Sequence, residues 1–245
     1  MSALVGETLD SLAHGAVRLA QRIDGYRFGT DAVLLADFAA HASERPPAQV
    51  VELGAGCGVV TLLLARRWPG TQFTGVELQP ALAELFARNV IMNGVADRVR
   101  SVCGDLRDPR VLSGQVVELV LCNPPYRPLG TGRRSVGRER ALARHEIACT
   151  LSDVIVAAAR QLKPGGRLRL IYPVARLAEL IAVLHQNGLE PKRLRFVHPR
   201  PDAPARLLLM EATRGGASGL DVLAPLVLYD VEGRPMPEFV VAQEL

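Results

Sequence analysis

The chain has 245 residues, of which 49% are hydrophobic and 22% charged, and its mean hydropathy is +0.16. This composition can bury a core, so it excludes a wholly disordered chain, and the length predicts one large domain with at most a short appendage. The formal net charge is +4, and because Lys163 and Lys192 are the only lysines, the positive charge comes almost entirely from arginine, which suits phosphate binding.

No apolar run reaches the roughly 18 residues of a membrane-spanning helix, and the opening MSALVGETLD lacks the basic start of a signal peptide. We therefore expect a cytoplasmic protein with no membrane partner. The four cysteines, Cys57, Cys103, Cys122 and Cys149, are widely spaced and form no C-x-x-C pair. That spacing predicts reduced, mostly buried thiols and no metal site.

The residues before position 49 have room for a strand and a helix. Residues 17–23, VRLAQRI, predict a strand, and Thr30 or Asp31 is expected to cap a helix that ends near Ala42. We interpret residues 1–48 as an appendage that packs on the domain that follows.

From residue 49 onward, apolar strand patterns alternate with helical patterns, which is typical of an α/β fold with a doubly wound sheet. The last two strands are joined only by the turn-like residues 199–204, so we expect an antiparallel final pair in a seven-stranded, mostly parallel sheet. Residues 214–245 form a tail to which the sequence assigns no structure. The predicted strands are 49–53, 72–78, 98–103, 116–122, 167–172, 192–198 and 205–211, and the predicted helices are 59–67, 81–93, 151–162 and 174–187.

A glycine-rich loop follows the first of these strands. Gly54, Gly56 and Gly58 have the spacing G-x-G-x-G, with Ala55 between the first two and Val59 after the third. Glycine allows a positive φ and lets the backbone approach a ligand closely, as in nucleotide-binding turns. Because the spacing differs from the dinucleotide fingerprint G-x-G-x-x-G, NAD is disfavoured.

Acidic residues stand at the ends of successive strands. Glu77 closes the second strand 23 residues after Gly54, close to the position where an acid binds the two hydroxyls of a ribose. Asp105 follows the third strand, where it can accept the amino hydrogens of an adenine, and Glu52 can pair with an ammonium group. Each feature alone also fits a tight turn or a helix cap, but their order predicts an adenosine without a pyrophosphate, namely S-adenosylmethionine. The contacts assigned to this cofactor extend to Ala55, Leu78, Leu106 and Asn123.

Asn123, Pro124, Pro125 and Tyr126 come directly after the fourth strand and are the predicted catalytic residues. Neither proline has an N–H group, so the segment is stiff and presents acceptors to a substrate amine. If the Asn123 side-chain oxygen and the Pro124 carbonyl each accept one amino hydrogen, the nitrogen lone pair can point at a methyl group on sulfur without a strong base. Tyr126 offers a face on which a flipped base can stack.

In these motifs the chain resembles the class I S-adenosylmethionine-dependent methyltransferases that methylate amino groups. It is most similar to the tRNA(Val) adenine-N6 methyltransferase family, which modifies the adenine beside the anticodon. The segments that carry the resemblance are QRIDGYRFGTDAVLLADF near 21–38, VVELGAGCGVVTLLLA near 50–65, NPPY, and ARHEIACTLSDVI near 143–155.

This resemblance implies a Rossmann-like methyltransferase domain over residues 49–213, with an antiparallel last strand. It places Thr30 and Asp31 near the methionine end of S-adenosylmethionine. It also implies a tRNA substrate whose adenine is methylated at N6.

The segment that follows Tyr126 is strongly basic. Residues 127–144 hold six arginines and one acid, a local charge of +5. Its glycines predict a mobile loop beside the substrate opening, with RNA phosphates as its partners. A second basic group on a predicted strand, Lys192, Arg193, Arg195 and His198, is expected either to contact RNA or to cover apolar surface with its aliphatic stems. The arginines of the first segment predicted to contact RNA are Arg127, Arg133, Arg134 and Arg138.

Three other functions fit the same motifs. A protein glutamine-N5 methyltransferase also uses N-P-P-Y on an amide nitrogen, but it carries a helical N-terminal domain. An rRNA guanine-N2 methyltransferase acts on another exocyclic amine, but more often shows N-P-P-F and a second domain. The third alternative is an RNA-binding module that keeps the cofactor-binding fold but catalyses no reaction. The basic segment and the intact motifs favour the tRNA enzyme.

Overall fold

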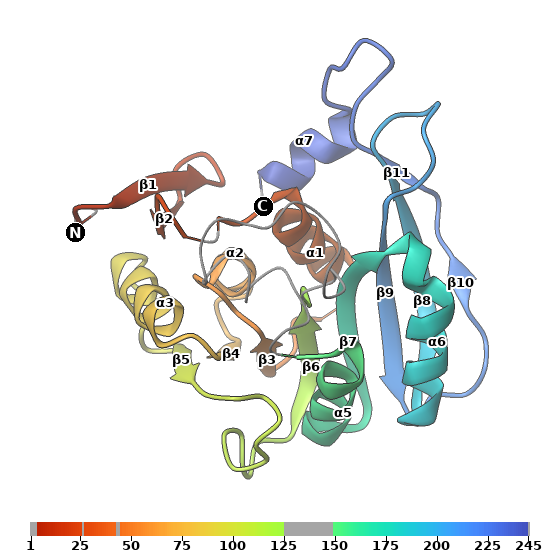
Figure 1. Ribbon diagram of the computed structural model, residues 1–245, viewed down its shortest axis with the longest axis horizontal. Helices are drawn as coiled ribbons and strands as arrows, with labels where there is room; N and C mark the ends of the chain where they lie inside the picture. The colour runs from red at the N-terminus through yellow and green to blue at the C-terminus, as the bar shows by residue number, and fades with distance from the viewer. Residues whose placement is uncertain (1–3, 26, 43–44, 125–148, 245) are drawn as a thin grey trace.

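The computed structural model describes residues 4–25, 27–42, 45–124 and 149–244. A twisted central sheet carries helices on both faces, and a separate two-stranded hairpin lies over part of one helical layer (Figure 1). Within these described ranges, no helix is both long and apolar enough to cross a membrane.

The central sheet runs in the order β5, β4, β3, β6, β7, β9, β8, and the short strands β10 and β11 pair with β8. Only β9 is antiparallel in the described sheet, to β7 on one side and to β8 on the other. The doubly wound, mostly parallel sheet with antiparallel β9 is therefore confirmed, but the described sheet has nine strands instead of seven, because β10 and β11 follow β9 and pair with β8. The strands are β3 (Gln49–Leu53), β4 (Gln72–Glu77), β5 (Val99–Cys103), β6 (Val117–Cys122), β7 (Leu162–Pro173), β8 (Leu189–His198), β9 (Leu207–Arg214), β10 (Asp221–Val222) and β11 (Leu226–Val227).

Alternating side chains of the strands fill two apolar cores, one on each face of the sheet. Val50 and Leu119 belong to the core beneath α1, α2 and α3, whereas Val51 and Val120 belong to the core beneath α5 and α6. Successive side chains of a strand point to opposite faces, so strands buried on both faces are apolar at nearly every position. The helices are α1 (Thr30–His41), α2 (Val59–Arg67), α3 (Pro80–Met92), α5 (Leu151–Gln161), α6 (Leu177–Gln186) and α7 (Pro237–Gln243).

The N-terminal region differs from the prediction in two respects. The predicted strand pairs with a second strand, so β1 (Glu7–Leu12) and β2 (Val17–Arg22) form an antiparallel hairpin. β1 has the sequence ETLDSL and is at most half-buried. It therefore lacks the pattern of apolar residues by which a strand is identified in a sequence. The predicted cap of α1 is wrong, because the residue before the helix is Gly29 and it makes no side-chain cap.

Asn89 of α3 and Asn93, directly after this helix, dock the hairpin onto the sheet domain. The Asn89 side chain accepts from the Ala20 N–H (2.8 Å) and donates to the Ala20 carbonyl (3.1 Å), and Asn93 repeats this pairing at Arg18 (2.9 and 2.7 Å). The Asn89 amide also donates to the carbonyl of Cys57 at 2.9 Å. Because side chains four residues apart share one face of a helix, the pair continues the backbone ladder of β2 and ties it to the glycine loop.

A buried arginine holds the C-terminal end of α1 against the sheet. Arg169 of β7 donates to Glu211 of β9 at 2.6 Å and to the carbonyl oxygens of Ala39 (2.7 Å) and Ala42 (3.1 Å). The last carbonyls of a helix have no partner within the helix, so this guanidinium both caps α1 and neutralises Glu211.

Several boundaries after residue 149 also differ from the prediction. β7 begins at Leu162, directly after α5, because Leu162 pairs with Val117 before the ladder resumes at Leu119 and Arg167. Residues 163–166, KPGG, bulge out between these two pairs. A 3-10 turn, Val174–Arg176, precedes α6, which is therefore shorter than predicted, and β8 begins at Leu189 instead of residue 192.

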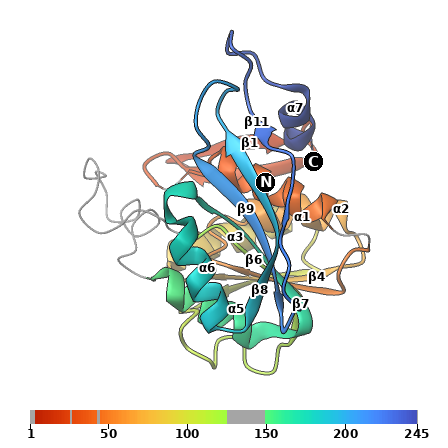
Figure 2. The same cartoon turned by 90° about the vertical axis from the view of Figure 1, so that its right-hand side faces the viewer.

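The C-terminal residues form β10, β11 and α7, none of which the sequence predicted. In Figures 1 and 2, α7 lies at the same end of the molecule as the turn of the β1–β2 hairpin. His14 of that turn is 3.3 Å from Glu244, so the C-terminal end of the described chain lies against the turn of the hairpin. All four cysteines are free, with Cys57 and Cys122 buried and Cys103 exposed.

Candidate functional site

The predicted site residues gather at the carboxyl ends of the parallel strands. β4, β3 and β6 lie side by side, and Leu53 at the end of β3 pairs with Val76 and with Cys122. Glu77 at the end of β4 pairs in turn with Cys103 of β5. The segments that follow these four strands therefore start at one rim of the sheet, which is where open α/β sheets bind ligands.

The glycine loop at this rim needs its glycines for different reasons. Gly54, Gly56 and Gly58 have φ values of +72°, +56° and +88°. A Cβ at Gly58 would lie 2.0 Å from the Phe86 ring, so this glycine is required for packing. A Cβ at Gly54 would meet no atom within 4 Å, so Gly54 borders open space in which a ligand can approach the backbone.

The N–H groups of the loop are already engaged within the protein. Gly54 and Ala55 both donate to the carbonyl of Val76 at 2.9 Å, Gly58 donates to Ala55 at 2.8 Å, and Gly56 donates to the Glu77 carboxylate at 2.9 Å. A loop that binds a pyrophosphate presents such groups to the ligand. These hydrogen bonds argue against a dinucleotide site.

Glu52 is buried beneath the loop, near the end of β3. Its Oε2 atom accepts from the Thr61 N–H at 3.0 Å and from the Thr61 hydroxyl, so it also caps the start of α2. Burial raises the pKa of Glu52 to about 8, although the hydrogen bonds from Thr61 oppose the shift. A carboxyl group in this position is poised to ionise when a cation approaches it.

The other two predicted acids have different surroundings. Buried Glu77 accepts from the N–H groups of Gly56 (2.9 Å) and Gln79 (2.8 Å), which fixes both carboxylate oxygens and leaves each able to accept again. Asp105 instead forms a two-point ion pair with Arg107, whose Nη2 lies 2.5 Å from Oδ2, and these hydrogen bonds lower the pKa of Asp105. Any bond from Asp105 to an adenine would compete with Arg107.

The two predicted hydrophobic neighbours of these acids also lie along the rim. Leu78, directly after Glu77, is 39% exposed, whereas Leu106 packs against the core beneath α5. The Leu106 carbonyl accepts from Arg160 at 2.8 Å. Leu78 is therefore the more accessible of the two to a ligand.

Asn123 follows β6 and meets the first turn of α1. Its Nδ2 donates to Oδ2 of Asp31 at 2.9 Å, and its Oδ1 is a buried acceptor without a hydrogen-bond partner in the described part of the chain. Pro124 is buried beside it. Such an acceptor is costly unless a ligand supplies the missing donor. Pro125, Tyr126, Arg127, Arg133, Arg134 and Arg138 lie outside the described residues.

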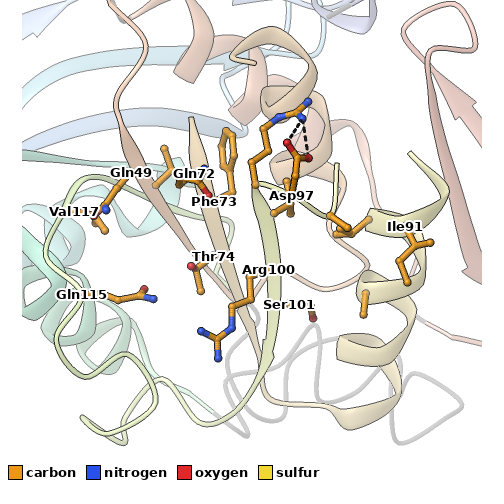
Figure 3. A pocket seen from close by; sticks show the side chains of 16 residues that line it. Gln49, Gln72, Phe73, Thr74, Ile91, Asp97, Arg100, Ser101, Gln115 and Val117 are labelled. Atoms are coloured by element: carbon orange, nitrogen blue, oxygen red, sulfur yellow. Dashed lines mark hydrogen bonds and ion pairs between the residues drawn. The ribbon is translucent and has the colours of Figure 1, made fainter. Parts of the chain in front are cut away.

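Thr30 lies in the same first turn and borders a cavity of about 830 Å³ between the β1–β2 turn, α1 and α7. A second cavity, of about 620 Å³, opens at the amino ends of the strands, between the starts of β3, β4 and β5 (Figure 3). Its labelled lining includes Gln49, Gln72 and Arg100, and it holds none of the predicted site residues. Of the predicted site residues, Thr30 lines the first cavity, whereas Glu52, Glu77 and Asn123 line neither of the two.

The second basic group holds the C-terminal segment in place. Lys192 donates to the carbonyl of Ala217 at 3.1 Å, and Arg195 donates to Ala224 at 3.0 Å and to Glu238 at 2.5 Å. His198 bonds to the carbonyl of Ala203 at 2.9 Å. These contacts give the group a structural role.

Sequence reasoning missed Thr61, Gly29 and Asn89 as supports of the site. Thr61 and Asn89 are fully buried polar residues in helices. In the sequence, a polar residue among the apolar residues of a helix face was the signal that could have identified each of them. Gly29 had no comparable signal.

Residues 21–178 match the methyltransferase small domain family. The chain belongs to this family. It is 31% identical over 221 residues to a tRNA1(Val) (adenine(37)-N6)-methyltransferase of Porphyromonas gingivalis, covering 87% of this chain and 86% of that protein.

Two solved structures resemble the fold. The crystal structure of a predicted O-methyltransferase from Agrobacterium tumefaciens has a TM-score of 0.69 at 26% identity and matches 87% of this chain and 95% of that one. The T. thermophilus 16S rRNA N2 G1207 methyltransferase, in complex with AdoMet and guanosine, has a TM-score of 0.59 at 18% identity. This match covers 85% of the present chain but only 50% of the rRNA enzyme.

The chain is an S-adenosylmethionine-dependent methyltransferase, and the rim fits that cofactor. The open space at Gly54 admits a ligand, while the engaged N–H groups of the loop suit a nucleoside without a pyrophosphate. We propose that Glu52, near the end of β3, meets the ammonium group and that Glu77, the last residue of β4, meets the ribose hydroxyls. When bound, the cofactor supplies a methyl group on a sulfonium.

Proposed function

We propose that this protein methylates N6 of the adenine at position 37 of tRNA1(Val), the reaction for which its P. gingivalis relative is named. The observation that carries the proposal is the Asn123 amide. Its nitrogen is tied to Asp31, and its buried oxygen lacks a donor in the described structure. An exocyclic amino group supplies the donor that this oxygen lacks.

The geometry suits a nitrogen nucleophile whose lone pair is delocalised into a ring. Hydrogen bonds from the amine to Asn123 Oδ1 and to the Pro124 carbonyl favour a tetrahedral nitrogen, so its lone pair can turn toward the methyl group. The amino proton becomes acidic only after the methyl group has moved from sulfur to nitrogen, and it is then released to water. Positioning and hydrogen bonding therefore replace a strong base. Tyr126 is proposed to stack on the flipped adenine, a contribution worth roughly 1 to 3 kcal/mol.

An oxygen nucleophile fits the site less well. A hydroxyl group has one hydrogen to donate and needs a base to remove it, whereas an amide such as Asn123 accepts a hydrogen bond without taking the proton. Amide and guanine nitrogens satisfy the same two acceptors as adenine does. The name of the 31% identical relative and the basic segment 127–144 favour tRNA adenine among them.

The test is methyl transfer to defined substrates. Purified protein is incubated with methyl-labelled S-adenosylmethionine and an unmodified tRNA1(Val) transcript, the same transcript with guanine at position 37, or release factor. The labelled product is then identified by nucleoside mass analysis. We expect N6-methyladenosine only in the first transcript, and loss of transfer in Asn123→Ala with little change in cofactor affinity. Label in release factor, in the guanine transcript or in none of the substrates would refute the proposal.

A further inference from the structure

We propose that Asp31 is a positioning residue that sets the orientation of the Asn123 amide. The two residues are 92 positions apart in the chain, yet Nδ2 of Asn123 donates to Oδ2 of Asp31 at 2.9 Å. Oδ1 of the same amide is buried without a donor in the described residues. The inference rests on the proposed amine chemistry at Asn123, but it does not depend on which RNA carries the amine.

The two ends of the Asn123 amide have opposite hydrogen-bonding roles. Rotation by half a turn about the last side-chain torsion exchanges the oxygen, an acceptor, with the NH2 group, a donor. An ionised carboxylate only accepts, so Asp31 favours the orientation in which NH2 faces it. The oxygen is then directed to the other side, where it can accept an amino hydrogen. The opposite orientation would present a donor to the substrate amine and repel it.

The backbone around Asp31 keeps its carboxylate in place. Asp31 is in the first turn of α1, where the helix dipole favours a negative charge. Gly29, just before the helix, has no side chain, and a Cβ there would lie 2.6 Å from Oδ1 of Asp31. At the far end of α1, Arg169 holds the carbonyls of Ala39 and Ala42. The carboxylate is thus held between a fixed helix and a glycine that leaves room for it.

The first test separates orientation from cofactor binding. Asp31→Ala should lower kcat on the order of 10- to 100-fold, the usual effect of misplacing a reacting group, while the Kd for S-adenosylmethionine changes less than about threefold. The matched control is Asp37→Asn in the same helix, a buried aspartate bonded to His41 and not to Asn123. The control should keep wild-type kcat. A weakened Kd at unchanged kcat would make Asp31 a cofactor ligand and overturn the inference.

An exchange of the two side chains gives a readout that a purely structural role would not produce. Asn123→Asp places two carboxylates face to face and should be inactive. Adding Asp31→Asn restores a donor opposite an acceptor, with the donor now on position 31. The kcat of the double variant should be at least about tenfold higher than that of Asn123→Asp alone. No recovery in a folded double variant would contradict the orientation role.

Two further measurements do not depend on turnover, so they stay informative if the proposed tRNA reaction fails. In the wild type, one Asn123 side-chain NH resonance should be shifted downfield and protected from exchange, and both features should vanish in Asp31→Ala. Gly29→Ala keeps both residues but displaces the carboxylate, so it should weaken the same resonance without unfolding the protein. An unchanged Asn123 resonance in Asp31→Ala would overturn the inference whatever the substrate.

Discussion

Replacement of Glu52 by glutamine should stabilise the unliganded protein and weaken cofactor binding. Glu52 is buried and bonded to Thr61, and burial raises its pKa from 4.5 to about 8. Glutamine has nearly the same shape, and its oxygen can still accept from the Thr61 N–H and hydroxyl. It carries no charge, so it avoids the cost of burying a carboxylate but cannot pair with an ammonium group.

The expected gain in the free energy of unfolding follows from the pKa shift. Between pH 4.5 and 8 the folded protein binds more protons at Glu52 than the unfolded chain does, so the stability of the wild type falls as pH rises through this window. Each pKa unit corresponds to about 1.4 kcal/mol, so the difference between variant and wild type approaches about 3 kcal/mol at pH 7. The difference should disappear below the ordinary pKa and level off above pH 8.

The assay is urea unfolding at pH 5.5, 7 and 8.5, followed by the fluorescence of Trp68. This is the single tryptophan of the chain, and it is buried and stacked on Phe73. Calorimetry with S-adenosylmethionine measures the expected loss of affinity in Glu52→Gln. The matched control is Glu118→Gln, which removes a partly exposed ion pair with Lys163 and should change stability by less than about 1 kcal/mol.

Two results would refute the reasoning about Glu52. A stability difference between variant and wild type that is the same at all three pH values would mean that the pKa of Glu52 is not raised. Unchanged cofactor affinity in Glu52→Gln would mean that this carboxylate does not meet the ammonium group, even if the stability prediction held.

Three further substitutions test the supports of the site. Gly54→Ala should cost about 1 to 2 kcal/mol of stability because residue 54 has a positive φ. The new Cβ should enter the space of the ligand, so calorimetry should find weaker cofactor binding. Unchanged affinity would exclude a close approach of the ligand to residue 54. Asn89→Ala removes three hydrogen bonds from buried backbone groups and should lower the free energy of urea unfolding by roughly 2 to 4 kcal/mol; a loss below about 1 kcal/mol would show that the hairpin is not docked through Asn89. Arg169→Met should lower the free energy of urea unfolding by about 3 to 5 kcal/mol because it leaves Glu211 buried and unpaired. Adding Glu211→Leu should recover part of that loss. If the losses of the two single variants simply add in the double variant, the pairing is contradicted.

The sequence predicted the central sheet well because its strands are buried on both faces. A run such as residues 116–122 is apolar at nearly every position, and the glycines and polar residues between the strands mark the turns. β1 was missed because it is half-exposed and pairs only with β2, so its pattern resembles that of a loop. The short strands β10 and β11 depend on β8 for their pairing and carry no local signal.

The site was predictable to the extent that chain order fixes strand ends. Parallel strands bring the residues that follow them to one rim, so the convergence of Glu52, Glu77 and Asn123 required only the order of the elements. Side-chain partners were not accessible in the same way. The pairing of Asp105 with Arg107 and that of Asn123 with Asp31 both depend on rotamers, and the second also depends on how α1 packs.

α1 links two features that sequence reasoning kept apart. Its first turn supplies Asp31 to Asn123 after β6, and its last carbonyls accept from Arg169 of β7, the strand next to β6. A helix held at both ends cannot slide along its axis without breaking a buried hydrogen bond, so the distance from its first turn to the end of β6 is fixed. The segment that precedes the sheet therefore belongs to the proposed site, because the orientation of Asn123 depends on it.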